Sequence, residues 1–229
     1  MATTFAAFVA AIQNEINDQD AAMKARIEGW INDLHHFICR AHRWQWLIKT
    51  SDSTLIKAST HPYDLTSLKV ATVTTPCRTV LDVRDEDFSP PRPLICTSED
   101  SVRQSLMQYA SSTGAPYWFY QRGDNKLGLF PIPDTTGRNY TVRYLILSTS
   151  YTTGSTNPLL IPDDWITVLK DAVLGKAYDF LDRVPKATEH KTMFLQELEV
   201  MKVQDSETVQ QIYPRQFVPP DIFPNTITP

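Results

Sequence analysis

Glycine is scarce in this chain of 229 residues, which has 7 glycines but 16 prolines. Loops that cradle phosphate groups depend on glycine, so the shortage argues against a phosphate-binding loop. The sequence also contains no GxGxxG, GxxxxGK[ST], GxSxG or HExxH motif. The usual sequence signatures of nucleotide-binding proteins, α/β-hydrolases and zinc peptidases are therefore excluded.

Cysteines and long apolar runs are also in short supply. The 3 cysteines are scattered and never spaced as CxxC, which predicts unpaired thiols in a reducing compartment. No apolar run approaches the roughly 20 residues that cross a bilayer. The first residues lack a basic segment and soon turn acidic, so we expect neither a signal peptide nor a membrane partner.

Basic residues are outnumbered, since 22 Lys and Arg against 26 Asp and Glu give a formal net charge of -4. A general DNA-binding surface would carry the opposite sign, because such binding depends on neutralising phosphates. The composition, 42% hydrophobic and 21% charged, is that of a globular protein. A chain of this length can form one large domain or two small ones.

Apolar residues spaced three and four apart predict helices at both ends of the chain. Near the N-terminus we expect helices over 4–17 and 21–43, joined by a short loop and packed as an antiparallel hairpin. Near the C-terminus we expect helices over about 161–183 and 186–208, separated at Pro185.

The middle of the chain is rich in Thr, Val, Ile and Leu and predicts β-strands. Within 139–149 the residues alternate with a period of two, as in a half-buried strand. Gly123–Asn125 predicts a turn between two strands, and a short helix is expected from Thr97 to about 109. The expected strands span 47–57, 68–74, 77–84, 117–121, 126–131 and 139–149.

This order of helices, strands and helices predicts an α+β fold. We expect a helical bundle formed by the N- and C-terminal helices, 1–46 and 158–208. An antiparallel β module, 47–157, is inserted between them, and an extended Pro-rich C-terminal arm, 209–229, follows.

The arm combines several prolines with apolar side chains and only one formal charge of each sign. Proline prevents the preceding helix from continuing and favours an extended, polyproline-like chain. Because a solvated tail would not carry so much apolar surface, we predict that the arm docks on a partner or a neighbouring subunit. The residues expected to dock are Ile212, Tyr213, Phe217, Val218, Pro219, Pro220, Ile222 and Phe223.

The densest acidic run comprises Asp82, Asp85, Glu86 and Asp87. It could form a divalent-cation site, a carboxylate pair for glycoside hydrolysis, or a negative rim that nucleic acid passes without sticking. Neighbouring carboxylates do not set the cross-cleft spacing that glycoside hydrolysis needs. A solvated turn at the end of a strand is therefore the favoured interpretation.

Two other groups of residues could form binding sites. His35 and Cys39 lie four residues apart, but a metal site would need two more ligands, so we expect a helix-surface histidine, a buried thiol and no metal or cofactor. The aromatic group Tyr117–Tyr120 could stack bases or sugars. No basic groove accompanies it, which favours a strand whose aromatics alternate between a core and an interface.

The order of these segments resembles that of tailed-phage head-to-tail adaptor proteins, also called head completion or connector proteins. Residues Trp30–Leu47 are similar to the second helix of these proteins. The resemblance runs over most of 4–208, and its motifs are moderately specific only as an ordered set. The other similar segments are Pro62–Leu65, Leu127–Pro133, Ile161–Trp165, Ala177–Asp182 and Phe194–Met201.

The resemblance implies a structural role rather than an enzymatic one. Such adaptors form a ring, commonly a dodecamer, under the portal, extend the DNA channel and provide the attachment platform for the tail. The implied partners are the portal ring, tail or nozzle proteins, further copies of the chain, and genomic DNA that passes through without sequence-specific binding. The arm would dock on the portal, the run 82–87 would form an acidic rim, and the protein would lie in the neck of the virion after assembly in the host cytoplasm.

Other functions stay open on the sequence alone. One alternative within the virion is a tail-tube or nozzle component. Another is a cell-wall glycoside hydrolase that uses the carboxylates of 82–87, which would need two separated carboxylates and a raised pKa for one of them. A third is a carbohydrate-binding module based on Tyr117–Tyr120.

Overall fold

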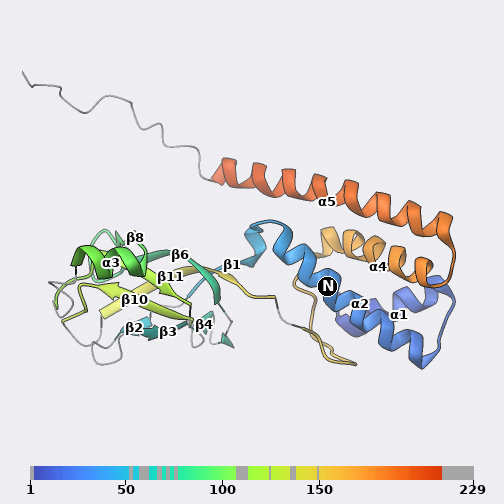
Figure 1. Cartoon of the computed structure of the whole chain (residues 1–229), viewed down its shortest axis with the longest axis horizontal. Coiled ribbons are helices and arrows are strands. Elements are labelled where there is room, and N and C mark those ends of the chain that lie inside the picture. Colours follow the sequence, from blue (N-terminus) through green and yellow to red (C-terminus); the bar gives the residue numbers. More distant parts are fainter. Residues whose placement is uncertain are drawn as a thin grey trace, which may run out of the picture.

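The computed structural model describes residues 3–51, 54–56, 62–65, 69–70, 73–74, 77–106, 113–123, 125–134, 138–148 and 150–212. The molecule is elongated, with a helical bundle at one end and a β module at the other (Figure 1). The chain starts in the bundle, crosses to the β module after residue 41 and returns to the bundle after residue 146. The predicted α+β class is confirmed.

The helical bundle consists of helices from both ends of the chain, as predicted: α1 (Phe5–Ile16), α2 (Ala21–Ala41), α4 (Ile166–Phe180) and α5 (Val184–Ile212). The hydroxyl of Thr4 caps α1 by accepting from the Ala7 amide at 3.3 Å. The helix ends at Asn17 in the left-handed conformation. Pro185 lies in the first turn of α5, where proline suits a helix start, so it opens the second C-terminal helix.

Helix α4 is the centre of the bundle and contacts α1, α2 and α5. Its buried residues lie on almost every side, which explains why it has little amphipathic character. Leu169, Val173, Leu174 and Ala177 are completely buried. The helix is shorter than predicted, because the segment Asp163–Trp165 forms a 3₁₀ turn and the chain bends at Asp182, which has a φ of 53°.

The larger sheet of the β module is built around its longest strands, β6 (Cys77–Asp85) and β11 (Arg138–Ile146), which pair antiparallel. Tyr140, Val142 and Tyr144 are buried, which confirms the period of two predicted for this strand. The order is β1-β11-β6-β7, and β2 also pairs with β11. The outer strands are β1 (Ile48–Thr50), β2 (Thr54–Ile56) and β7 (Arg92–Pro93).

A second sheet of four strands has the order β3-β10-β9-β8. The predicted turn at Gly123–Asn125 joins β9 to β10, and Asn125 adopts a positive φ of 58°. The pair β8–β9 is parallel, so the module is not wholly antiparallel. The remaining elements are β3 (Tyr63–Asp64), β4 (Lys69–Val70), β5 (Val73–Thr74), β8 (Ile95–Cys96), α3 (Glu99–Leu106), β9 (Trp118–Arg122) and β10 (Lys126–Phe130).

The junction of the two parts is held by side chains of α2 and of the segment after it. Trp44 is completely buried and its indole Nε1 donates to the Ile38 carbonyl at 2.6 Å. The ring nitrogens of His36 lie 2.6 and 2.9 Å from the hydroxyls of Ser148 and Ser150, which follow β11. The side chain of Asn32 bonds both the amide and the carbonyl of Tyr151. The returning chain is thus fixed along α2.

The expectation of a helix-surface histidine at position 35 is wrong, because the returning chain covers that side of α2. His35 is completely buried, and its ring meets that of Tyr151 edge-on at 5.2 Å. Burial, and to a smaller extent the nearby His36, lower the pKa of His35 to about 4. The thiol of Cys39 is buried as expected, and burial raises its pKa to about 12.

The low pKa of His35 predicts a loss of stability in acid. The unfolded chain binds a proton at this residue below about pH 6.5, whereas the folded chain does so only near about pH 4. The stability that the buried, neutral His35 contributes to the fold is therefore complete above pH 6.5 and is lost as the pH falls toward 4. It amounts to about 2–3 kcal/mol between about pH 7 and about pH 4.5. Urea unfolding of the wild type and of His35→Leu at both pH values measures this loss. Between the two pH values, the free energy of unfolding should fall by about 2–3 kcal/mol less in the variant than in the wild type. Equal losses would contradict the assignment.

Candidate interaction surfaces

Helix α5 is nearly twice as long as the helix on which it packs. Its 29 residues extend for about 43 Å, against about 22 Å for the 15 residues of α4. The inner face of α5 is anchored in the core by Ala187, Phe194, Leu198 and Met201. The C-terminal part projects beyond α4 towards the β module (Figure 1). The segment after residue 212 therefore begins outside the bundle core.

Asp205 fixes this projecting part of α5 to the junction. Its two carboxylate oxygens lie 3.1 and 3.3 Å from the Gln45 amide, which donates to them. One of them also lies 3.2 Å from Nε2 of His42. These contacts join residues 160 positions apart in the sequence and set where the helix end lies. The spacing of apolar residues along α5 does not predict these contacts of Asp205 with Gln45 and His42.

The residues predicted to dock on a partner lie at the end of α5 and in the segment that follows it. The arm was predicted to be extended from residue 209, but α5 continues to Ile212, so residues 209–212 are helical; the docking role of Ile212 stays a prediction. The helix stops two residues before Pro214, which disfavours helical geometry at Tyr213. The other predicted docking residues, Tyr213, Phe217, Val218, Pro219, Pro220, Ile222 and Phe223, lie outside the described residues.

A second apolar surface lies on the outer side of α5. Met193, Val200 and Val203 are 41%, 50% and 55% exposed. Their spacing of seven and three residues places them on one face, opposite the side that is buried against α4. We call this surface the outer α5 stripe.

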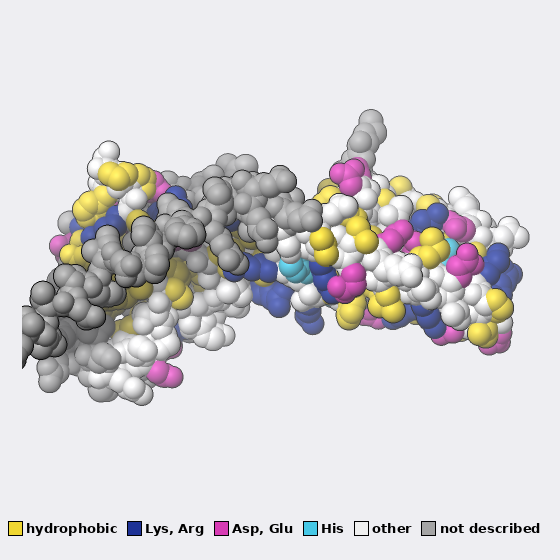
Figure 2. All heavy atoms as spheres, turned by 90° about the horizontal axis from the view of Figure 1, so that it is seen from above, with side chains coloured by type: hydrophobic (Ala, Val, Ile, Leu, Met, Phe, Trp, Pro, Cys, Tyr) yellow, Lys and Arg dark blue, Asp and Glu magenta, His cyan; other side chains and the backbone are white. Residues whose placement is uncertain are grey.

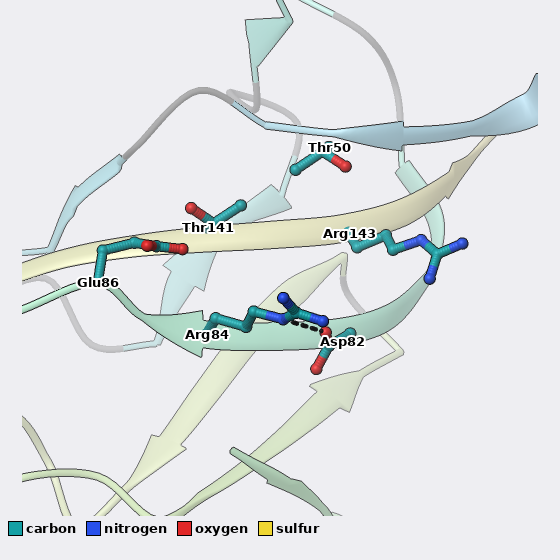
Figure 3. Close-up of a pocket in the computed structure, with 6 residues that line it drawn as sticks. All are labelled: Thr50, Asp82, Arg84, Glu86, Thr141 and Arg143. Atoms are coloured by element: carbon teal, nitrogen blue, oxygen red, sulfur yellow. Dashed lines mark hydrogen bonds and ion pairs between the residues drawn. The ribbon is translucent and has the colours of Figure 1, made fainter. Parts of the chain in front are cut away.

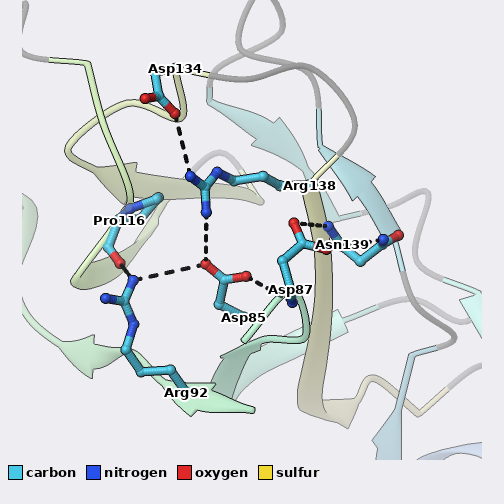
Figure 4. Close-up of polar contacts among 7 residues, drawn as sticks. All are labelled: Asp85, Asp87, Arg92, Pro116, Asp134, Arg138 and Asn139. Atoms are coloured by element: carbon cyan, nitrogen blue, oxygen red, sulfur yellow. Dashed lines mark hydrogen bonds and ion pairs between the residues drawn. The ribbon is translucent and has the colours of Figure 1, made fainter. Parts of the chain in front are cut away.

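The acidic run does not form a single surface (Figure 4). Asp85 is completely buried, and its carboxylate lies 3.4 Å from Arg138 and 3.8 Å from Arg92. Asp87 accepts from the backbone and side-chain nitrogens of Asn139. The interpretation of the whole run as a solvated turn is wrong at Asp85. A buried carboxylate paired with two arginines is equally unavailable to an acidic rim.

The network around Asp85 instead connects three strands of the larger sheet. Arg92 lies on β7, Arg138 begins β11, and Asp85 ends β6. The guanidinium of Arg92 also donates to the Pro116 carbonyl at 2.5 Å and lies over the ring of Tyr117. Burial and the negative charge of Asp85 raise the pKa of the nearby Tyr140 hydroxyl. The sequence offered no signal for this network, because Arg138 is 53 residues from Asp85.

Asp82 and Glu86 lie on the exposed face of the same sheet and line a pocket of about 200 Å³ (Figure 3). The other lining residues are Thr50, Arg84, Thr141 and Arg143. Asp82 is already paired with Arg84 at 2.9 Å. A glycosidase needs two carboxyl groups facing each other across a cleft, one of them in apolar surroundings. This pocket instead presents acidic and basic side chains together on one face of the sheet.

The aromatic group of β9 does not form an exposed platform. Phe119 is 2% exposed and belongs to the core, whereas Tyr117 is 52% exposed. The ring of Tyr120 lies over Gly128, where any side chain would collide with it. Trp118 packs against the ring of Phe130. Phe119 alone of these aromatics is buried, between the half-buried Trp118 and Tyr120, so they form no flat surface for stacking sugars.

The described residues contain no group of three or more His, Cys, Asp or Glu side chains that could hold a metal ion. His35 and Cys39 do approach each other, at 3.7 Å, without a third ligand in that set. In the part of the chain that the structure describes, no helix is both long enough and apolar enough to span a bilayer.

Comparison with known proteins identifies one family. The model of the family described as SU10 adaptor protein matches residues 3–216. The match includes the helical bundle, the β module and the first residues after α5. A search of curated proteins finds no match to the chain.

The buried position of Asp85 predicts that its charge is required for stability. Asp85→Asn should lower the free energy of unfolding by about 3 kcal/mol, since it removes the buried charge that Arg92 and Arg138 share and leaves Arg138 with the more exposed Asp134. The matched control is Asp82→Asn on the same strand, which removes an exposed pair and should cost less than about 1 kcal/mol. Urea unfolding compares the two variants, and equal losses would contradict the role given to Asp85.

Proposed function

The chain belongs to the SU10 adaptor protein family, a family of phage head-to-tail adaptors, and we propose that it forms a ring under the portal, extends the DNA channel and provides the attachment platform for the tail. Its family is structural and is not a class of enzymes. The proposed location is the neck of the virion, after assembly in the host cytoplasm.

The observation that carries this proposal is the projection of α5 beyond the bundle. A docking arm must start from a rigid point outside the subunit's own core. Asp205 supplies such a point by holding the end of α5 to Gln45 and His42. The arm that follows carries Tyr213, Phe217 and Phe223, whose aromatic rings suit pockets on a partner. Its prolines reduce the ordering cost of docking on the portal.

Ring formation needs two different surfaces on each subunit, because a cyclic ring is built from heterologous contacts. The outer α5 stripe supplies one apolar surface, with Met193, Val200 and Val203 exposed along it. We propose that this stripe contacts the neighbouring subunit. The family resemblance makes a dodecamer the expected ring.

The proposed channel passes DNA without reading its sequence. Asp82, Glu86 and Asp87 are the members of the acidic run that keep some exposure, and they stay candidates for a rim of the channel. A negative rim would repel phosphates and let DNA slide. Tail or nozzle proteins would join at the side of the ring away from the portal.

Removal of the arm tests its proposed role. A chain that ends at Ile212 retains all of α5, so it should keep the helical signal and melting temperature of the full chain. It should lose binding to purified portal rings, because the apolar anchors are gone. Native mass spectrometry with and without portal measures both the binding and the copy number. A truncated chain that binds portal with full affinity would refute the docking role.

A paired substitution separates the anchors from the mere presence of the arm. Phe217→Ser with Phe223→Ser should weaken portal binding at least tenfold, about 1.4 kcal/mol or more. Thr226→Ala with Thr228→Ala, in the same arm, should leave it unchanged. A full chain that binds tail components but never portal would instead favour a tail-tube or nozzle component.

The outer α5 stripe predicts an assembly defect without a folding defect. Val200→Asp places a charge at an exposed position, so the free energy of unfolding should change by less than about 0.5 kcal/mol. The number of subunits bound per portal ring should fall, because the charge would be buried between neighbours. Thr188→Asp adds the same charge on α5 away from the stripe and serves as the control. Equal occupancy of the two variants would exclude the stripe from the ring contact.

A further inference from the structure

A basic pocket lies where the helical bundle meets the β module. Its volume is about 350 Å³, and it draws residues from both parts of the molecule. Figure 2 shows Lys and Arg side chains gathered beside a His in this narrow region. We call it the arginine pocket. Its lining comprises Arg40, His42, Arg43, Arg78, Thr79, Leu81 and Leu145.

The three arginines of this pocket are exposed and have no carboxylate partner among the described residues. Arg40 lies in the last turn of α2, Arg43 in the segment that leaves it, and Arg78 on β6. Asp205, the carboxylate next to His42, already accepts from the Gln45 amide. Like charges held this close repel one another, so the pocket favours a ligand with more than one negative charge.

Guanidinium groups restrict the chemistry of that ligand. Each presents several N–H donors in a planar fork, which matches the oxygens of a phosphate or a carboxylate. Leu81 and Leu145 offer apolar surface against which the arginine stems can lie. The lining holds no Asn or Gln amide and no Phe, Tyr or Trp ring for a base, so its main contacts are those of the guanidinium groups with anionic oxygens. The pocket therefore suits a repeating anion recognised by charge alone.

A second copy of the chain is a poor source of that anion. Two of the four carboxylates in the densest acidic run, 82–87, are paired with arginines of their own subunit. Asp82 pairs with Arg84, and Asp85 is buried between Arg92 and Arg138. From this run a neighbour would thus offer at most Glu86 and Asp87, two charges against three arginines. A polyphosphate backbone carries a charge at every nucleotide.

We propose that the arginine pocket binds backbone phosphates of double-stranded DNA, independently of its sequence. The inference rests on the proposed function only in naming DNA as the polyanion that reaches the pocket. Repeated around a ring, these pockets would place a band of phosphate contacts in a subunit whose formal net charge is -4. The overall charge would let DNA slide, and the band would hold it once it stops.

The salt dependence of DNA binding tests the proposal. The full chain is titrated against a short fluorescein-labelled duplex by anisotropy, between about 50 and 200 mM salt. A triple variant, Arg40→Gln, Arg43→Gln and Arg78→Gln, should bind more weakly. Its plot of log affinity against log salt should be shallower by about 2–3, because each phosphate contact contributes about 0.9 to the slope. A second duplex of unrelated sequence should give the same values.

A control variant removes the same charge elsewhere. Lys24→Gln, Lys176→Gln and Lys186→Gln neutralise three cations of the bundle that do not line the pocket. This variant should keep the wild-type slope to within about 1. Equal losses in both triple variants, or no binding by the wild type at low salt, would overturn the proposal. Circular dichroism and the melting temperature confirm that both variants are folded.

Portal binding by native mass spectrometry separates this inference from the proposed function. A chain that binds portal but not DNA overturns the arginine pocket alone. A chain that binds DNA but not portal overturns the adaptor proposal alone. If the arginine variant keeps its affinity for DNA and loses its ring contacts, the pocket receives an acidic protein surface, and the DNA proposal is wrong.

Discussion

The hydrogen bonds along one side of α2 determine how the two parts of this molecule sit together. In the described chain, two passages connect the helical bundle to the β module, one after residue 41 and one after residue 146. Asn32 and His36 form hydrogen bonds to the returning passage, and the completely buried Trp44 anchors the outgoing passage. These contacts also hold the side of the arginine pocket that includes Arg40 and Arg43. They place the Gln45 amide within hydrogen-bond distance of Asp205. The arm and the arginine pocket both depend on this junction.

Elements defined by local periodicity could be predicted from the sequence, and those defined by distant contacts could not. The spacing in α1 and α2, the alternation in β11 and the turn ending at Asn125 each depend on neighbours within a few residues. The burial of Asp85 depends on Arg138, which only the pairing of β6 with β11 brings close. His35 was misplaced for the same reason, since Tyr151 covers it from far along the chain.

Average charge was a poor guide to local surfaces. A net charge of -4 argues against general DNA binding, yet Arg40, Arg43 and Arg78 come together with no carboxylate partner among the residues that the structure describes. The acidic run shows the opposite case, because its sequence is dense in charge but arginines pair with two of its four carboxylates. Charge in this protein is therefore organised by pairing between strands and helices, and composition reports only its sum.

The length of α5 has a mechanical consequence. The helix is held at two places, by its packing on α4 and by Asp205, which lies seven residues before its last residue. Tension applied through the arm would therefore load the bonds from Asp205 to Gln45 and His42 before it reaches the apolar packing. Those bonds sit at the junction, so a pull on the arm becomes a torque between the bundle and the β module. The helix would therefore act as a lever that pivots at the Asp205 carboxylate, its contact nearest to the arm.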